Sequence, residues 1–563
     1  MDGRVVAGSH CAVWHVVTHF IRVGGIRSHR DSMEKRAFLA VVLSLLVLVV
    51  YQQWLERNYS PAPPPPVSKT DKTADTVAPK AVPELKPAPP TAPVSQQEAT
   101  EIRVETDNYR AIFTGRGGRL KSFTLKRYRA SVEEKSPPVE IVVDEPGMAY
   151  PLGIRLNGAA PYSDENMIYA VAGSDLKLTG EAKGSLRFEG QTPMGVTIKK
   201  EFTFTGSTYG IGMDVTVTGS ESAPSLSITS QAKGPANDAL FEGFLGIVGG
   251  KLIREYGEEL QKGKEFTGTV SWAGFGYTYF LLAVLPDTAK EAKVTVKETD
   301  PLITMDIAPT SPDKGVSKSH YTLFIGPKDL ALLRAFERGL ERSIDFGYFY
   351  LISVPLLHVM QFLHGFTGSY GVDIILITVL IKLLTAPLTH KSYASMKQMQ
   401  KLQPQMERLK EKFKDDKEKL NKEIMELYRR NKVNPLGGCL PMVLQIPVFI
   451  GLYNALLTPI ELRHAPFMWI KDLSRPDWES LPVHFAGWSL GLPILTIFMG
   501  ASMFVQQWMT PTAGDPNQRR MMMLMPVMFT VMFINFPSGL TIYWLVNNIL
   551  SIAQQYLVNR MSR

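Results

Sequence analysis

The chain contains a series of apolar runs that are each about long enough to cross a lipid bilayer. A helix rises about 1.5 Å per residue, so roughly 20 apolar residues span the hydrocarbon core. The runs occupy residues 37–54, 370–389, 439–459, 488–509, 521–537 and 540–557. The sequence Pro537-Ser538-Gly539 separates the last two runs, and we expect these to form a tight hairpin. The pattern predicts a multi-span α-helical membrane protein with six transmembrane helices.

The N-terminal 97 residues divide into three segments. Residues 1–32 show no sustained periodicity, and Met33-Glu34-Lys35-Arg36 precedes the first apolar run. We therefore expect Met33 to be the natural start and residues 1–32 to be a non-native extension. No small-residue cleavage site follows the run, so residues 33–57 are predicted to form an uncleaved signal-anchor helix. Residues 58–97 are rich in proline and predict an extended linker.

Residues 98–343 show the period-two alternation of β-strands, interrupted by turns. The clearest hairpin turns at residues 205–208. Its apolar residues alternate on one face: Val196, Ile198, Phe202 and Phe204 before the turn, and Tyr209, Ile211, Met213, Val215 and Val217 after it. Many strands and few helical stretches predict a large extracytoplasmic β-sandwich domain.

The period becomes helical from about residue 327. The spacing of Leu330, Leu333, Phe336 and Leu340 predicts a helix that starts after Pro327. Residues 344–368 follow, and their apolar pattern is broken by Pro355 and several polar side chains. This segment is predicted to be an amphipathic helix that lies in the membrane interface rather than crossing it.

Charge predicts the orientation of the helical core at residues 369–560. The segment from His390 to Lys432 carries 13 Lys and Arg against 7 Asp and Glu, which places it in the cytosol. The C-terminus is then cytosolic, whereas the loop at residues 460–487 and the β-rich domain are extracytoplasmic. Apolar residues at helical spacing predict that residues 390–432 form a helical hairpin. Its charged faces are either solvated or used for docking a protein, and the sequence leaves both open.

The overall charge and the cysteines exclude several other classes of protein. The net charge is +8, but the basic residues flank apolar runs and do not form one patch with stacking aromatics. This argues against nucleic-acid recognition. The two cysteines, Cys11 and Cys439, cannot build a disulfide framework or a zinc site. We expect neither a metal nor a cofactor.

Lys382 is the residue most suggestive of function, because it lies in the middle of an apolar run. A cation at the bilayer centre is costly and usually faces a protein interior or a water-filled cavity. Thr378, Thr385 and Thr389 share its helix face and predict a polar stripe. Polar residues of the other runs could face it: Gln445, Gln506, Gln507, Asn535, Asn547 and Asn548. The alternative is that Lys382 snorkels to the cytosolic interface and anchors its helix.

Three motifs in this order resemble the YidC/Oxa family of membrane protein insertases. They are residues 433–441 (VNPLGGCLP), 445–449 (QIPVF) and 536–540 (FPSGL). The anchor and the large outer domain are similar to the Gram-negative form of the family. The resemblance covers almost the whole chain from Met33.

The resemblance implies a periplasmic β-supersandwich and a hydrophilic groove formed by five core helices. Lys382 falls at the position of the family's groove cation, where many members have Arg, so the planar guanidinium fork is lost here. By the same resemblance, Thr378 would line the groove, and Gln445, Ile446 and Phe449 would contact substrate. Tyr543 and Trp544 would form the groove's aromatic pair in the last helix, where Trp replaces a common Tyr. The implied partners are nascent membrane proteins, the lipid bilayer, components of the Sec translocon and, weakly or transiently, the ribosome.

Two other classes of function are weighed against insertion. Lys382 could act as the base for a nucleophilic serine such as Ser502 or Ser538, but neither lies in a motif that places it there. A solute transporter would be expected to show repeated broken helices, and we see no such repeat.

Overall fold

The structure is a computed structural model. It describes residues 100–561 except 146–148, 158–160, 221–222, 237, 288–290, 311–314, 415, 432, 434–439, 486–487 and 511–515. The predicted extension at 1–32, the signal anchor at 33–57 and the linker at 58–97 lie outside the described residues, as does most of the motif at 433–441.

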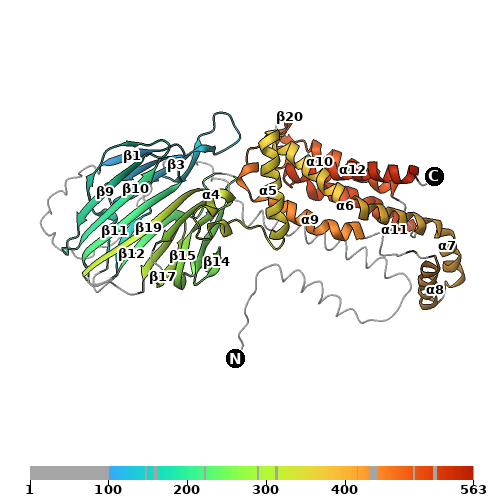
Figure 1. The fold of residues 1–563 in the computed structure, drawn as a ribbon, viewed down its shortest axis with the longest axis horizontal. Helices are drawn as coiled ribbons and strands as arrows, with labels where there is room; N and C mark the ends of the chain where they lie inside the picture. The colour runs from blue at the N-terminus through green and yellow to red at the C-terminus, as the bar shows by residue number, and fades with distance from the viewer. Residues whose placement is uncertain are drawn as a thin grey trace, which may run out of the picture. The chain divides into compact units, whose positions relative to one another are not determined.

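The described strands between residues 101 and 327 form two sheets, in which most neighbouring strands are antiparallel (Figure 1). The smaller sheet has the strand order β4-β3-β2-β1-β8. Its strands are β1 (Glu101–Glu105), β2 (Tyr109–Thr114), β3 (Arg119–Arg129), β4 (Pro138–Val142) and β8 (Leu176–Lys177). The larger sheet has the order β6-β5-β12-β18-β17-β15-β16-β19-β11-β10-β9-β7, with β13 and β14 extending from β15. The β-rich prediction for this region is confirmed.

The strands of the larger sheet have the following bounds: β5 (Gly153–Leu156), β6 (Tyr162–Ser163), β7 (Ala170–Ala172), β9 (Lys183–Gln191), β10 (Thr197–Thr205), β11 (Gly210–Ser220), β12 (Pro224–Gln231), β13 (Phe241–Val248), β14 (Lys251–Glu255), β15 (Lys264–Tyr277), β16 (Phe280–Pro286), β17 (Glu291–Thr299), β18 (Leu302–Pro309) and β19 (Gly315–Pro327). A short helix, α3 (Glu258–Gln261), precedes β15.

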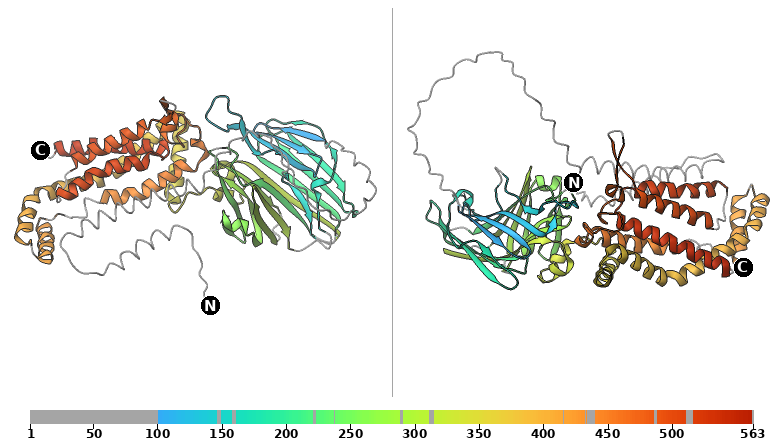
Figure 2. Two further views of the ribbon diagram at one scale, coloured as in Figure 1. Left: turned by 180° about the vertical axis from the view of Figure 1, so that it is seen from behind. Right: turned by 90° about the horizontal axis from the view of Figure 1, so that it is seen from above.

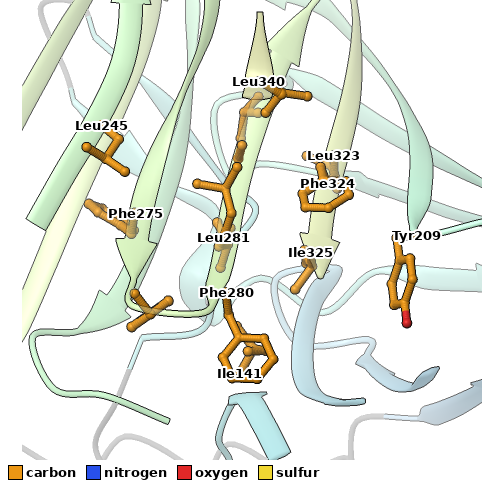
Figure 3. Close-up of a cluster of buried hydrophobic side chains, with 14 of the residues drawn as sticks. Ile141, Tyr209, Leu245, Phe275, Phe280, Leu281, Leu323, Phe324, Ile325 and Leu340 are labelled. Atoms are coloured by element: carbon orange, nitrogen blue, oxygen red, sulfur yellow. The ribbon is translucent and has the colours of Figure 1, made fainter. Parts of the chain in front are cut away.

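The predicted hairpin is the pair β10 and β11. These strands are antiparallel, with Ile198 opposite Val217 and Phe204 opposite Ile211. The apolar residues predicted on one face are all buried, because that face forms part of the domain core. Figure 3 shows another part of this core, where Phe280, Leu281 and Phe324 of β16 and β19 lie among buried side chains from other strands.

A charged residue also occupies the buried face of β10. Lys200 lies between Ile198 and Phe202 in the alternation and is fully buried. Its Nζ contacts Asp164 Oδ2 at 2.6 Å and donates to the backbone oxygens of Gly117 and Leu152 at 2.6 and 2.9 Å. The core therefore contains a charge whose donors are used, as buried charges require.

The helix predicted from Leu330 to Leu340 is shorter than expected. Helix α4 (Leu330–Arg334) begins where predicted, and Asp329 caps it by accepting hydrogen bonds from the amides of Ala331 and Leu332. The helix does not continue to Leu340, which instead begins the 3₁₀-helix Leu340–Ser343. The chain leaves right-handed helical backbone before Leu340, because Glu337 has a φ of 51° and Gly339 a φ of 77°.

The C-terminal part of the described chain is helical. Its helices are α5 (Tyr350–Thr367), α6 (Tyr370–Lys401), α7 (Gln403–Lys412), α8 (Lys417–Arg430), α9 (Leu440–Leu457), α10 (Ile494–Met509), α11 (Pro516–Phe533) and α12 (Ser538–Met561). Helix α12 packs against both α6 and α10, and α10 packs against α11. Figures 1 and 2 show α6, α9, α10, α11 and α12 running side by side, with α5 lying across them.

Several predicted boundaries shift, most of all at α10, α11 and α6. Residues 488–491 belong to a short hairpin of β20 (Pro482–Phe485) and β21 (Trp488–Gly491), and α10 starts only at Ile494. Pro493 disfavours helical backbone at the preceding residue, which explains this late start. Helix α11 ends at Phe533 rather than at residue 537. Helix α6 continues through residue 390 to Lys401, so the predicted cytosolic hairpin is completed by α7 and α8 after a long first helix.

Within the described part of the chain, α6 is the one helix that is long and apolar enough to cross a membrane by length and composition. Shorter apolar helical stretches occur at Gln445–Leu457, Ile494–Met509 and Met522–Phe533.

The junction of α5 and α6 holds a buried carboxylate. Asp373 in the first turn of α6 is fully buried and pairs with Nδ1 of His364 at 2.9 Å. Thr367 also donates to Asp373. Negative charge at a helix N-terminus is favourable, because the unpaired amides there carry partial positive charge. Phe362 and Phe366 of α5 remain 66% and 78% exposed, as an amphipathic helix requires on its apolar face.

Candidate functional site

The predicted polar stripe of α6 makes hydrogen bonds within its own helix and, through Lys382 and Thr389, with α12. Thr378 is only 1% exposed, and its hydroxyl donates to the carbonyl of Ile374 at 2.6 Å. Thr385 and Thr389 likewise donate to carbonyls four residues earlier, at 2.9 and 3.1 Å. Threonines in a helix often satisfy their hydroxyls in this way. Much of the stripe's hydrogen bonding is thus satisfied within the helix.

Lys382 is partly buried and has a partner on the neighbouring helix. Its Nζ donates to Ser551 Oγ of α12 at 2.6 Å. Ser551 in turn donates its hydroxyl to the carbonyl of Asn547 at 2.6 Å. Among the described residues no ion pair joins Lys382 to a carboxylate, and the cation retains donor capacity because an ammonium group has three N–H bonds.

A second polar contact joins α6 and α12 farther along both helices. The side-chain amide of Gln554 donates to Thr389 Oγ1 at 2.8 Å and to the carbonyl of Ala386 at 3.2 Å. The two contacts lie seven residues apart on α6 and three apart on α12, so both bridge the same helix pair. They form a polar seam along an otherwise apolar interface.

Predicted residues of α9 also meet predicted residues of α12. The amide of Gln445 donates to the hydroxyl of Tyr543, a side chain that is 1% exposed. The Phe449 ring contacts Trp544 edge to face, with centroids 5.0 Å apart. Ile446 on α9 is 49% exposed. The structure thus brings together Gln445 with Tyr543, and Phe449 with Trp544.

Asn535 is separate from this arrangement. It was expected in the fifth apolar run, but α11 ends at Phe533 and Asn535 lies exposed in the turn before α12. The prediction that it faces Lys382 from within a helix is therefore wrong in position, because the chain leaves the helix two residues earlier.

Two further polar residues of α12 were missed as site residues. Ser551 and Gln554 contact Lys382 and Thr389, but neither was among the residues predicted from the sequence. The signal was present in the sequence, since Asn547, Ser551 and Gln554 are spaced four and three residues apart and share a helix face.

The serines proposed for a hydrolase are engaged elsewhere. Ser538 Oγ donates to the carbonyl of Arg475 at 2.7 Å, and Ser502 Oγ donates to that of Met499 at 2.6 Å. Ser551 does contact Lys382, but its proton is held by a carbonyl and it lies within α12. Backbone amides inside a helix are already bonded, so they cannot form an oxyanion hole beside this serine. The geometry does not favour acyl transfer.

One group of side chains in the described residues has metal-ligating chemistry. Asp238, His464 and Asp472 place a ligand atom each within 4.8 Å of one another. However, the carboxylate of Asp238 is already held by Arg463, whose Nε and Nη2 donate at 2.7 and 2.8 Å. The bidentate ion pair accounts for this carboxylate without a metal.

Family comparisons agree with the resemblance seen in the motifs. The family described as "60Kd inner membrane protein" matches residues 362–563, and the "YidC periplasmic domain" matches residues 101–359.

Curated relatives match over almost the whole length. The membrane protein insertase YidC of Pelobacter propionicus is 40% identical, over 94% of this chain and 99% of the relative. That of Geobacter metallireducens is 41% identical, over 94% of this chain and 98% of the relative. A crystal structure of an active YidC insertase is 18% identical, covers 82% of this chain and 94% of its own, and has a TM-score of 0.35. From the sequence matches, the chain belongs to the YidC family of membrane protein insertases, as an inner-membrane protein with a periplasmic β-rich domain and a helical C-terminal part.

Proposed function

We propose that this protein inserts and folds inner-membrane proteins by holding a polar flank of the client beside Lys382. The observation that carries the proposal is a partly buried lysine in the apolar stretch of α6 whose described partner is a neutral serine. A cation in such a place costs free energy, and ionisable residues inside a membrane usually mark a functional site. It attracts an acidic side chain of a passing segment more strongly than a surface lysine would, because screening by water is reduced.

The proposed route of the client follows the contacts of α9 and α12. The groove would be lined by Lys382, Thr378, Thr385, Gln445, Ile446, Phe449, Tyr543 and Trp544. The apolar segment of the client would slide along α9 and α12 into lipid. Burial of this segment supplies free energy of about 25 cal/mol per Å² of apolar surface, so the step needs no nucleotide. A polar groove shortens the apolar distance that the flank must cross.

The proposed topology places six helices in the membrane. The signal anchor at residues 33–57 and the five core helices α6, α9, α10, α11 and α12 would cross it. The hairpin of α7 and α8 and the C-terminus would be cytoplasmic, as the basic excess of the segment at residues 390–432 favours. Helix α5 would lie in the periplasmic interface, since it runs across the other helices and exposes aromatic residues (Figure 1).

Assistance from other partners is a further part of the proposal. Clients that also need the Sec translocon would pass to this protein laterally, whereas small clients would insert without it. The ribosome would contact the chain weakly or transiently. The relatives are named as insertases rather than as hydrolases, which agrees with the unfavourable serine geometry.

The test is insertion by the purified full chain in sealed liposomes with no energy source. The client carries one apolar segment and an acidic flank, and insertion is read as a fragment protected from added protease. We expect protection to depend on the protein and to fall with Lys382→Ala. Lys391→Ala is the matched control, because Lys391 is an exposed lysine of the same helix. Equal protection in empty liposomes and in those with protein would contradict the proposed function.

A further inference from the structure

We propose that Ser551 is a positioning residue for the insertion step, because it holds the ammonium of Lys382 at a fixed point between α6 and α12. An acidic side chain of the client then meets an oriented cation rather than a freely moving one. This inference rests on the proposed function and concerns the selection of clients by the charge of their polar flank.

The geometry gives Ser551 the role of an acceptor. Its Oγ accepts a hydrogen bond from Lys382 Nζ at 2.6 Å. Its hydroxyl donates a hydrogen bond to the carbonyl of Asn547, also at 2.6 Å. The side chain is 3% exposed, so the oxygen lies at a defined place in the interface of α6 and α12. A hydroxyl whose proton is already bonded presents its lone pairs to the ammonium.

The neighbouring polar residues of α12 have other partners. Asn548 donates to Ser502 of α10 at 3.0 Å, and Gln554 donates to Thr389 of α6 at 2.8 Å. In the described part of the structure, Ser551 is therefore the residue of α12 whose hydroxyl accepts a hydrogen bond from Lys382. A lysine side chain has four rotatable bonds, and ordering it in advance lowers the entropy lost when a client binds.

The contact with Ser551 need not break when a client arrives. An ammonium has three donors, and Ser551 occupies one of them. Lys382 remains partly exposed, so a carboxylate can approach the remaining donors. Ser551 thus orients the cation in the presence of the client as well as in its absence.

The test compares Ser551→Val with Ser551→Thr in the reconstituted full chain. The two replacements have the same shape, but only threonine keeps a hydroxyl oxygen. Their difference therefore reports the contacts that the Ser551 hydroxyl makes with Lys382 and with Tyr393, and the acidic client reads out the first of these. Two clients that differ only in an acidic or an amide-substituted flank are inserted in parallel. We expect Ser551→Val to lower the preference for the acidic client by about tenfold, the factor for one hydrogen bond to a charged group, and Ser551→Thr to keep it.

A second readout follows the position of the ammonium directly. A zero-length carbodiimide joins a client carboxylate to Lys382 only when the two groups are in contact. We expect the yield of this cross-link to fall in Ser551→Val and to persist in Ser551→Thr and in Ser502→Ala. Ser502→Ala is the control because it removes a partly buried hydroxyl, at the contact of α10 with α12, that has no contact with Lys382 among the described hydrogen bonds.

The outcomes separate this inference from the proposed function. If the unaltered protein inserts neither client, the proposed function fails. If it inserts both and Lys382→Ala abolishes the acidic preference, but Ser551→Val leaves preference and cross-linking unchanged, only the role of Ser551 is refuted. A rise in acidic preference with Ser551→Val would also overturn it, since Ser551 would then compete with the client.

Discussion

The Nζ atom of Lys200 lies 2.6 Å from Oδ2 of Asp164, and both side chains are fully buried in the β-rich domain. Arg119 donates to the other carboxylate oxygen at 2.7 Å, and Tyr169 adds a hydroxyl at 3.0 Å. Burial lowers the pKa of Lys200 to about 8, although the charge of Asp164 opposes this effect. The cluster joins β10, β3 and the 3₁₀-helix Asp164–Asn166 through one carboxylate.

Removing the lysine from this cluster should strongly destabilise the domain. Lys200→Met removes one of the two cations that neutralise the buried carboxylate of Asp164. Breaking a buried ion pair in this way costs about 3–5 kcal/mol of stability. The melting temperature of the protein, read from the β signal in circular dichroism, should fall accordingly. Lys199→Met is the control, because Lys199 on the same strand is partly exposed and lies 4.0 Å from Glu189. Equal losses in the two variants would show that burial of the pair is not the cause.

The ion pair of Asp238 with Arg463 should make the stability of the protein depend on pH in the acidic range. Burial raises the pKa of Asp238, but hydrogen bonds from His464 and Arg463 outweigh this and lower the pKa to about 2. The folded state therefore favours the ionised form of Asp238 over the protonated form. The contribution of ionised Asp238 to the free energy of unfolding is fully present above the ordinary aspartate pKa of about 3.9. It is lost as the pH falls towards 2.

The corresponding variant is Asp238→Asn. It should lower the free energy of unfolding by about 2 kcal/mol at pH 7, and the difference from the unaltered protein should vanish near pH 2. Urea unfolding at a series of pH values in detergent measures this. Asp287→Asn, which breaks an exposed pair with Arg338, should have a small effect at every pH. A difference for Asp238→Asn that persists unchanged at pH 2 would exclude the electrostatic explanation.

Two replacements of Lys382 should separate the effect of its charge from that of its shape. Lys382→Arg keeps a positive charge and should retain the preference for acidic clients, whereas Lys382→Gln should lose about tenfold of it, because it removes a charge-assisted interaction. The measurement is the protease-protected fraction of paired clients with acidic and neutral flanks. Retention of the preference in Lys382→Gln would mean that a neutral polar group at this position is sufficient.

The contact of α9 with α12 should tolerate loss of its hydrogen bond. Tyr543→Phe removes the hydroxyl that accepts from Gln445 but keeps the ring. Hydrogen bonds between membrane helices contribute about 0.6 kcal/mol on average, so the melting temperature should change little. Phe449→Ala should cost more, because it removes a ring that contacts both Trp544 and Phe533. Equal effects of the two changes would contradict this order.

The sequence determined the local elements of the protein, because hydrophobic periodicity is a local property of the chain. The alternation at residues 196–217 predicted β10 and β11, and the apolar runs predicted the positions of α6, α9, α10, α11 and α12. The family motifs predicted the class of function before any fold was known. Helix boundaries were less visible in the sequence: α10 begins only after Pro493, and α4 ends at Arg334, ahead of the positive φ of Glu337.

Only the tertiary structure decided which polar side chains meet. Lys382 and Ser551 are 169 residues apart, and their contact depends on the register with which α6 packs against α12. The apolar alternation of β10 gave no sign that Lys200 is buried in an ion pair, because its partner Asp164 comes from a different element. Periodicity shows which face of a helix or strand is buried, but the partner across that face is set by packing between segments that are distant in sequence.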